Sequence, residues 1–266
     1  MVFMTKTFYK YQGTGNDFVV FDNRQMDFDK NNASFINRLC DRKYGIGADG
    51  LLLLEDSATT DFTMVYFNAD GTLGSMCGNG GRCIVAFASF LGIVDTDTQF
   101  EAFDGLHKAT ITNGIVSLQM KNINNVEIHK DHIFLDTGSP HHVQCVDNVS
   151  DFDVDSIGRK IRYEAPYFET GANVNFVQVL SENTFKVRTY ERGVEAETLS
   201  CGTGVTAVAI AMHATQQTSH NEILLHTEGG VLQVRFVNQG SNYNDVFLVG
   251  PAVQVFSGTI DIDKNV

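Results

Sequence analysis

The sequence predicts an α/β (α+β) fold of two pseudo-twofold-related domains, each a curved, mostly antiparallel sheet wrapped around a central helix. Three observations predict it. Strand-like segments far outnumber helical ones, and several landmarks recur at one offset along the chain. Two segments begin with Cys-Gly-x-Gly, at Cys77 and Cys201, and continue as short runs that are apolar on nearly every side. Such a run lacks the polar face of a surface helix and is too short to cross a bilayer, so each is expected to be a helix buried in a core.

The composition is that of a folded, acidic protein. Its 266 residues, 43% of them hydrophobic, can bury one large core or two of ordinary size. The net charge of −13 argues against binding to nucleic acid or to an acidic membrane surface, since both are held by Lys and Arg. Residues 1–6 lack the continuous apolar core of a signal peptide, and no segment has the character of a membrane span. We therefore expect a cytoplasmic protein.

The first half begins with strand-like alternation over residues 3–23, around a turn at residues 13–17. Asn31 and Asn32 are suited to cap a helix whose apolar positions run from Phe35 to Cys40. Further strands are expected at residues 51–54 and 62–67, before the first buried helix, and at residues 98–103, 107–112 and 115–121 after it.

The second half repeats this order. Two strands near 132–136 and 142–147 precede a helix near 152–162, on which Val154, Ile157 and Ile161 share one face. Strands near 174–180 and 184–191 lead to the second buried helix, and four more are expected near 222–227, 231–237, 245–249 and 253–260.

The repeat predicts where the domains divide. Cys201 follows Cys77 by 124 residues, and two glycine pairs are 125 residues apart, Gly13 with Gly138 and Gly105 with Gly230. We expect an N-terminal half over residues 1–122, joined by a C-terminal strand near 253–266, and a C-terminal half over residues 123–252. A duplicated unit would place its two cysteine loops across an interdomain cleft, a common location for a ligand site.

The five cysteines indicate a reducing compartment, because they are odd in number and include no Cys-x-x-Cys pair. Neither a disulfide framework nor a zinc site is expected. Cys40, Cys83 and Cys145 fit a simple role as small buried hydrophobes. Cys77 and Cys201 differ, because amides and the dipole at a helix N-terminus stabilise a thiolate and hold a carboxylate. Two opposed thiols beside one carboxylate suit removal of a proton from one face of a carbon and its return to the other.

No cofactor is predicted for this chemistry. The sequence has no dinucleotide fingerprint, no P-loop and no clustered metal ligands. A lysine that binds pyridoxal phosphate remains an alternative, although Lys108, Lys121 and Lys186 lie in strand-like alternation that is typical of a solvated face. A cofactor-free reaction needs strong electrostatic help in a dry cavity, since the α-proton of an amino acid is weakly acidic.

An ordered set of motifs resembles the diaminopimelate epimerase family. The motifs span residues 9–204 and are Tyr11-Gln12-Gly13-Thr14-Gly15-Asn16-Asp17-Phe18, Gly45-Ile46-Gly47-Ala48-Asp49, Phe67-Asn68-Ala69-Asp70-Gly71, Met76-Cys77-Gly78-Asn79-Gly80-Gly81-Arg82, Gly138-Ser139-Pro140-His141, Asn173, Tyr190-Glu191-Arg192-Gly193 and Cys201-Gly202-Thr203-Gly204. Together they are highly specific, whereas Cys-Gly-x-Gly alone is shared with proline racemase-like relatives.

The resemblance implies interconversion of LL- and meso-2,6-diaminopimelate in lysine biosynthesis, with neither metal nor pyridoxal phosphate, by a homodimer. Cys201 would accept the proton of the LL substrate and Cys77 would donate one, with the roles exchanged in reverse. The implied contacts to the reacting carboxylate come from Gly78, Asn79, Gly202 and Thr203. Those to the distant amino and carboxylate groups come from Asn16, Asn68, Asn173, Glu191 and Arg192. His141 and Glu191 would tune the thiols.

The sequence departs from the family pattern in three places. Gly50 stands where many members have glutamine, and the segment from Glu191 to Thr198 is one residue longer than the shorter pattern. Ser139, an implied substrate-binding residue, stands where asparagine is frequent. These departures bear on substrate recognition and leave the two-cysteine chemistry intact. Two alternatives remain, a proline or hydroxyproline racemase-like epimerase and a non-catalytic thiol or binding protein of the same fold.

Overall fold

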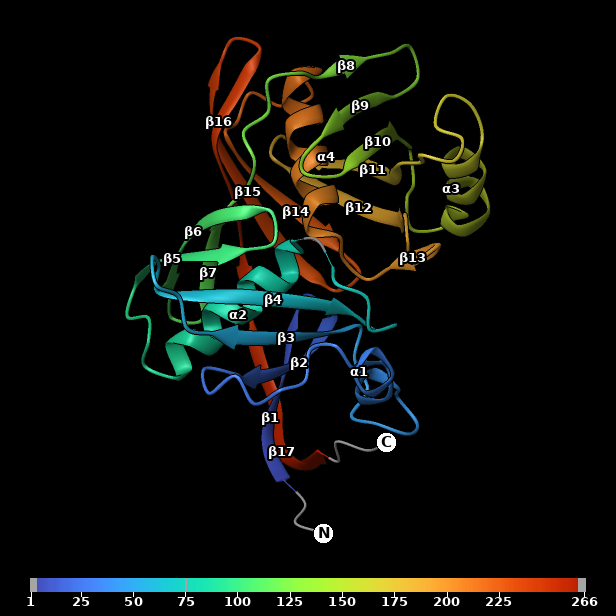
Figure 1. Ribbon diagram of the computed structural model, residues 1–266. Coiled ribbons are helices and arrows are strands. Elements are labelled where there is room, and N and C mark those ends of the chain that lie inside the picture. The colour runs from blue at the N-terminus through green and yellow to red at the C-terminus, as the bar shows by residue number, and fades with distance from the viewer. Residues whose placement is uncertain (1–3, 75, 263–266) are drawn as a thin grey trace. The chain divides into compact units, whose positions relative to one another are not determined.

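The computed structural model describes residues 4–74 and 76–262, which form two compact units (Figure 1). Unit 1 contains residues 4–118 and 251–262, and unit 2 is Gln119–Gly250. The predicted boundaries after residues 122 and 252 stay predictions of where the duplicated halves divide. Residues 1–3, part of the segment judged for a signal peptide, and residues 263–266 of the predicted last strand lie outside the described residues.

Unit 1 is a sheet with two helices. Its helices are α1 (Ala33–Cys40) and α2 (Gly78–Phe90). Its strands are β1 (Met4–Gly13), β2 (Asn16–Asp22), β3 (Gly50–Glu55), β4 (Phe62–Asn68), β5 (Asp97–Ala102), β6 (Gly105–Thr112), β7 (Ile115–Gln119) and β17 (Val253–Ile262). They pair in the order β17-β1-β2-β3-β4-β5-β6-β7, with β2/β3 and β4/β5 parallel and the others antiparallel.

Unit 2 is likewise a sheet with two helices. Its helices are α3 (Val154–Tyr163) and α4 (Gly202–Ala214). Its strands are β8 (Glu127–Ile128), β9 (Ile133–Asp136), β10 (Pro140–Cys145), β11 (Asn173–Ser181), β12 (Thr184–Glu191), β13 (Ala196–Thr198), β14 (Glu222–Thr227), β15 (Gly230–Gln239) and β16 (Asn242–Pro251).

The two sheets share one pairing pattern. In unit 2 the order is β8-β9-β10-β11-β12-β14-β15-β16, again with two parallel pairs, β10/β11 and β12/β14, while β13 pairs with β12. The run from β1 to β7 thus has the same succession of parallel and antiparallel pairs as the run from β9 to β16. Each cysteine helix follows the equivalent strand, β4 in unit 1 and β12 with β13 in unit 2. The predicted fold class, a mixed α/β chain of two repeated units, is confirmed.

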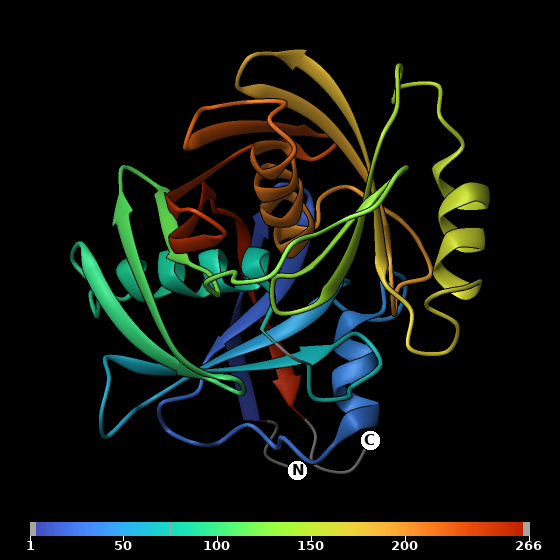
Figure 2. The same cartoon turned by 90° about the horizontal axis from the view of Figure 1, so that it is seen from above.

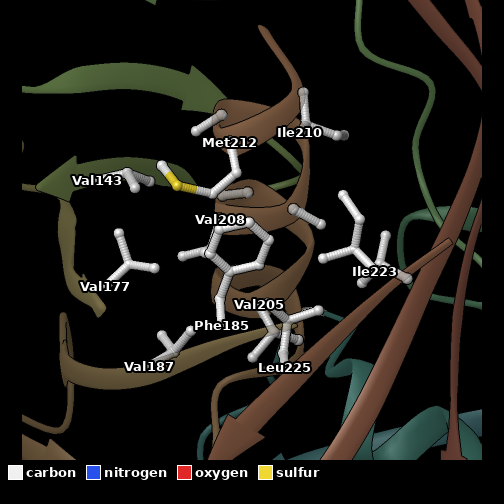
Figure 3. Close-up of a cluster of buried hydrophobic side chains, with 14 of the residues drawn as sticks. Val143, Val177, Phe185, Val187, Val205, Val208, Ile210, Met212, Ile223 and Leu225 are labelled. Carbon is white, nitrogen blue, oxygen red and sulfur yellow. The ribbon is translucent and has the colours of Figure 1, made fainter. Parts of the chain in front are cut away.

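Each cysteine helix forms the centre of its unit, as its lack of a polar face predicts. α2 packs against β1, β2, β3, β4, β6 and β17, and α4 against β9, β10, β11, β12, β14 and β15. In Figure 2 the strands of unit 2 curve around α4, and α3 lies on the outer side of the sheet. Figure 3 shows Val205 and Val208 of α4 packed against Phe185 and Ile223 from the surrounding strands. Burial of such side chains contributes about 1.5–3 kcal/mol each.

The outer helices have conventional ends. Asn32 caps α1 by accepting from the backbone amide of Phe35 at 3.0 Å, as predicted. Asp153 caps α3 by accepting from Ser156 at 3.1 Å, and Val154, Ile157 and Ile161 pack on the core. Within the described part of the chain, none of the helices combines the length and apolar character needed to cross a membrane.

Three local predictions were wrong or incomplete. Cys145, expected to be a buried hydrophobe, is exposed at the end of β10, whereas Cys40 and Cys83 are buried as expected. Lys121 lies just beyond β7 and pairs with Asp136 at 3.0 Å. The short strands β8 and β13 were not predicted, because two or three residues carry no recognisable alternation.

Candidate active site

Cys77 lies directly before the N-terminus of α2 in unit 1. We use the term helix mouth for the cysteine and the first residues of the helix that follows it. Cys77 has extended backbone angles (φ −109°, ψ 121°), and its side chain makes no capping hydrogen bond. The Cys77 carbonyl accepts the first hydrogen bond of the helix, from the Gly81 amide at 2.7 Å. The sulfur is directed to the turn between β1 and β2, where it donates to Oδ1 of Asn16 at 3.5 Å. The fold therefore positions the thiol, and the thiol does not cap the N-terminus of the helix.

The amide of Asn16 is oriented by a charged network. Its Nδ2 donates to Oδ2 of Asp49 at 2.8 Å, so its Oδ1 faces the thiol and also accepts from Nδ2 of Asn79 at 3.3 Å. Arg42 holds Asp49 at 2.8 Å and pairs with Asp17 at 2.7 Å. Burial alone would raise the pKa of Asp17, but Arg42 and Lys10 lower it to about 2. Three predicted site residues, Asn16, Cys77 and Asn79, thus lie together.

Cys201 occupies the corresponding position in unit 2. It precedes α4 with nearly the same backbone angles (φ −112°, ψ 112°) and also leaves its side chain out of the cap. The Val205 amide donates to the Cys201 carbonyl at 2.9 Å. The sulfur lies 3.5 Å from Oγ1 of Thr203, whose backbone carbonyl accepts from Oγ1 of Thr137 at 2.9 Å. The predicted residues Cys201, Gly202 and Thr203 therefore form one mouth.

A buried polar chain supports this second mouth. Asn175 donates to Nδ1 of His141 at 3.2 Å and accepts from Oγ1 of Thr189 at 3.0 Å, and His141 is fully buried. A side-chain atom added at Gly204 would lie 2.4 Å from Oδ1 of Asn175, so this amide packs directly on the first turn of α4. Burial lowers the pKa of His141 to about 3, which keeps the imidazole neutral at pH 7. Because Nδ1 accepts from Asn175, the proton of the neutral ring is assigned to Nε2. Any influence of His141 on a thiol at neutral pH is that of a neutral ring.

A second group of predicted residues gathers at the ends of β11 and β12. Oδ1 of Asn173 accepts from the Arg192 amide at 2.9 Å, and the Arg192 guanidinium donates to the Thr170 carbonyl at 2.9 Å. Glu191 accepts from Oγ1 of Thr198 at 2.9 Å. Ser139 lies in the turn before β10, where its carbonyl accepts from the Thr137 amide at 3.1 Å. These groups offer a carboxylate, a guanidinium and an amide within one unit.

Asn68 ends β4 directly opposite Gly50 in the register, and its Nδ2 donates to Oγ1 of Thr72 at 3.1 Å. A side-chain atom added at Gly50 would lie 2.6 Å from the Tyr66 ring and 3.2 Å from its hydroxyl. The absence of a side chain at residue 50 is thus matched by the half-buried ring of Tyr66. Tyr66 was not among the predicted site residues, and the departure from the family pattern at Gly50 was the signal in the sequence that pointed to it.

Arg82 belongs to the motif around Cys77, but no role was predicted for it. It lies inside α2 and is fully buried. A cation in the first turns of an otherwise apolar helix was the signal available in the sequence.

Comparison with known proteins supports this reading of the two units. The sequence pattern described as diaminopimelate epimerase matches residues 8–124 and 133–255. A diaminopimelate epimerase from Flavobacterium psychrophilum is 58% identical over 253 residues, covering 95% of this chain and 99% of that protein. One from Chlorobaculum tepidum is 39% identical, covering 94% of this chain and 99% of that protein.

Solved structures of distant sequence share the fold. A Bacillus anthracis phenazine biosynthesis protein of the PhzF family superposes with a TM-score of 0.77 at 12% identity, covering 97% of this chain and 100% of that chain. A hydroxyproline epimerase from Agrobacterium vitis superposes with a TM-score of 0.70 at 13% identity, covering 98% and 94%. At these identities the likeness shows the fold alone. The family pattern and the near full-length relatives decide the question, and the chain belongs to the diaminopimelate epimerase family.

Proposed function

We propose that this protein interconverts LL- and meso-2,6-diaminopimelate, with Cys77 and Cys201 as the two bases and no cofactor. The observation that carries the proposal is the repeated helix mouth. Each unit presents a cysteine before a core helix, with matching backbone angles and a side chain that is not used for capping. A single such cysteine would fit a redox thiol or a tight turn, but the repetition of the mouth in both units supports a pair that acts together.

Both mouths favour negative charge. The first amides of α2 and α4 have no partner within the helix, and with the helix dipole they stabilise a thiolate and bind a carboxylate. In this proposal Gly78, Asn79, Gly202 and Thr203 hold the reacting carboxylate. That contact strengthens as the α-carbon loses its proton and charge moves onto the carboxylate, so it lowers the barrier for proton removal.

The proposed reaction is a balanced transfer of two protons. The Cys201 thiolate removes the α-proton of the LL isomer, and the electron pair of the C–H bond remains on the substrate. The Cys77 thiol then gives its proton to the opposite face, which yields the meso isomer, a Cys77 thiolate and a Cys201 thiol. The reverse reaction starts from that form. The scheme requires both sulfurs to flank one carbon, and this placement is part of the proposal.

The remaining predicted residues would select a substrate with a second amino-acid head. Arg192 can grip a carboxylate with its planar fork, Glu191 can accept from an ammonium group, and Asn173 can serve either. Asn16 and Asn68 complete the set in unit 1. A substrate with one head, such as proline, would make none of these contacts and would lose the binding energy that they contribute.

We further propose that the protein acts as a cytoplasmic homodimer in lysine biosynthesis. Light scattering at micromolar concentration should give twice the mass of one chain. A monomer mass would contradict the dimer and leave the reaction untouched.

Incubation of the reduced protein with LL-diaminopimelate in deuterated water tests the function. We expect the meso isomer to form with deuterium at the inverted α-carbon, at a rate unaffected by prior treatment with a metal chelator or hydroxylamine. Absence of exchange would reject the enzyme assignment. Loss of activity after either treatment would reject the cofactor-free mechanism, and faster turnover of proline would favour the racemase alternative.

A further inference from the structure

Arg82 is a buried cation in an unfavourable position. It lies in the second turn of α2 with none of its surface exposed, among residues that are otherwise apolar or small. A positive charge near a helix N-terminus opposes the helix dipole, and transfer of an ion from water into a protein interior costs several kcal/mol. The guanidinium remains protonated in proteins, so it cannot escape this cost by losing its charge.

The hydrogen-bond partners of the Arg82 guanidinium are all neutral. Its guanidinium donates to the Gly78 carbonyl at 3.2 Å, to Oγ1 of Thr14 at 3.3 Å and to the Pro251 carbonyl at 3.5 Å. Among the ion pairs of residues 4–74 and 76–262, none includes it. A side-chain atom at Gly13 would lie 3.1 Å from Nη2, so the backbone of β1 closes over the group. The fold thus encloses the guanidinium closely, and none of its hydrogen-bond partners is an anion.

That place adjoins Cys77 on two sides. Gly78 directly follows Cys77 at the start of α2, and Thr14 belongs to the same turn as Asn16, which accepts from the thiol. Burial lowers the pKa of Arg82, while the thiols of Cys83 and Cys77 act in the opposite direction. Burial raises the pKa of Cys83 to about 12, so this neighbour stays neutral.

The other titratable groups around α2 are tyrosines, members of pairs or exposed. Burial raises the pKa of Tyr11 on β1 to about 12. Lys10 of β1 pairs with Asp17 of β2 at 2.7 Å. The remaining groups on the strands that pack against α2 are Lys6 paired with Asp27, Tyr9, Asp22 paired with Arg24, Glu55 paired with Lys30, Tyr66, His107 paired with Asp104, the exposed Lys108, and Asp261 bonded to Thr5. Arg82 is thus the cation at this mouth whose charge has no opposite charge beside it other than a Cys77 thiolate.

At the equivalent helix position, unit 2 has an uncharged residue. Residue 206 occupies the position of Arg82 at the offset of 124, and it is a buried threonine. Its Oγ1 donates to the Gly202 carbonyl at 2.9 Å, which is the bond that the Arg82 guanidinium makes to Gly78 in unit 1. Arg82 and Thr206 therefore make equivalent hydrogen bonds, and they differ by one positive charge.

We propose that Arg82 is an electrostatic positioning residue that stabilises the Cys77 thiolate, so that Cys77 ionises more readily than Cys201. The inference about ionisation stands on the geometry of unit 1, and its importance for catalysis rests on the proposed function. In the reaction scheme, the enzyme form with ionised Cys77 is the form that acts on the meso isomer. Arg82 thus favours that form of the resting enzyme.

A comparison of kcat/KM for the forward and reverse reactions cannot show that Cys77 ionises more readily than Cys201. A catalyst leaves the equilibrium constant unchanged, so an Arg82 variant must lower kcat/KM for the LL and meso isomers by the same factor. The difference appears instead in the pH dependence, because loss of the charge moves ionisation of Cys77 to higher pH. Thiol ionisation is also measurable without substrate, since the thiolate is the nucleophile in alkylation.

The test is alkylation of the full-length, ligand-free protein by iodoacetamide between pH 5 and 10, with Cys77 and Cys201 resolved by peptide mass spectrometry. In the native protein we expect the midpoint for Cys77 to lie below that for Cys201. Arg82→Met should raise the Cys77 midpoint by about one pH unit or more and leave Cys201 unchanged. Arg82→Lys, which keeps the charge and loses the fork, should retain most of the lowering. Thr206→Val, the matched control, should leave Cys77 unchanged.

Three results would overturn the proposal: a Cys77 midpoint at or above that of Cys201 in the native protein, an unchanged midpoint in Arg82→Met, or equal shifts in Arg82→Met and Arg82→Lys. The last would indicate a structural role for the side chain. The comparison of the Cys77 and Cys201 midpoints in the native protein can reject the proposal even where Arg82→Met does not fold. A lowered Cys77 midpoint in a protein that fails to exchange deuterium would reject the proposed reaction and leave the ionisation inference standing.

Discussion

The mouths of α2 and α4 have the same backbone conformation, and the side chains around them differ in charge and polarity. Both cysteines adopt nearly the same backbone angles before helices of 13 residues. Around Cys77 lie the amide of Asn16 and the buried charge of Arg82, whereas unit 2 combines Cys201 with Thr203 and a neutral His141 held by Asn175. A duplicated unit can therefore keep the backbone geometry that presents a thiol, while the neighbouring side chains give the two thiols different electrostatic environments.

Of the changes that test this comparison, removal of either thiol has the largest expected effect on activity. Cys77→Ala and Cys201→Ala should each lower epimerisation by about 10²–10⁴-fold, because each removes one of the two proton carriers. In deuterated water, Cys77→Ala given the LL isomer should still exchange its α-proton slowly without inversion, through Cys201. Chiral chromatography with mass spectrometry separates exchange from inversion.

Near-normal turnover by either folded variant would contradict the two-base scheme. Inversion without exchange would contradict proton transfer itself. Cys145→Ala is the matched control, because this thiol is exposed and lies outside both mouths.

The second prediction compares equivalent glycines in the two helices. A methyl group at Gly204 would lie 2.4 Å from Oδ1 of Asn175, which is fixed by Thr189, so Gly204→Ala should destabilise the protein by about 1–3 kcal/mol and impair activity. At Gly80 the closest atom would be Cε of Met64 at 3.4 Å, an ordinary contact. Gly80→Ala should be neutral or stabilise by up to about 1 kcal/mol.

Denaturant unfolding of both variants measures this contrast. Equal stability changes would mean that Asn175 does not support α4 as described.

The third prediction concerns mild acid. Burial lowers the pKa of His141 to about 3 and that of His142 to about 4. Below a pH of about 6.5 the unfolded chain binds protons that the folded unit refuses, so the free energy of unfolding decreases as pH falls from 6.5 toward 4, by at most about 1.4 kcal/mol per pH unit for each histidine. Asp17 in unit 1 has its pKa lowered to about 2, so its stabilisation is complete above pH 3.8 and is lost only below it.

Unit 2 should therefore open first in mild acid. Hydrogen exchange with mass spectrometry at pH 7 and pH 4.5 should show loss of protection in β10 and β11 before β2 and β3. His142→Phe, which removes a titrating ring and keeps an aromatic group against His132, should reduce the effect. Simultaneous loss of protection in both units would contradict this assignment.

The smallest expected effect tests the orientation of Asn16. Asp49→Ala removes the acceptor that turns Oδ1 of Asn16 toward the thiol, which is a contact worth about 1 kcal/mol. We expect kcat/KM to fall about fivefold with little change in stability. The exposed Asp56→Ala serves as control. An unchanged kcat/KM in Asp49→Ala would show that Asn16 needs no such support.

The sequence predicts the parts of this molecule that depend on local pattern. The central helices followed from the lack of a polar face after Cys77 and Cys201, and the cap at Asn32 followed from its spacing to Phe35. The repeat was visible because landmarks kept one offset even where identity between the halves was low. The predicted fold class was confirmed by the structure, and the predicted family by the comparison with known proteins.

The sequence could not predict contacts between distant segments. Arg82 meets Thr14 across 68 positions, and Asn16 meets Asp49 across 33, so their roles depend on how β1, β2 and α2 pack. An arginine in a helix ordinarily reaches solvent, and nothing in the local pattern indicated that the backbone at Gly13 would enclose it. The ring of Tyr66 over Gly50 depends likewise on the register between β3 and β4.

The central claim is that the two sulfurs act on one carbon, and a crystal structure with a bound substrate analogue tests it most directly. The account predicts Cys77 and Cys201 on opposite faces of a single α-carbon, each sulfur within about 3–4 Å of it. Sulfurs that lie far from each other, or on the same face of the bound analogue, would contradict it.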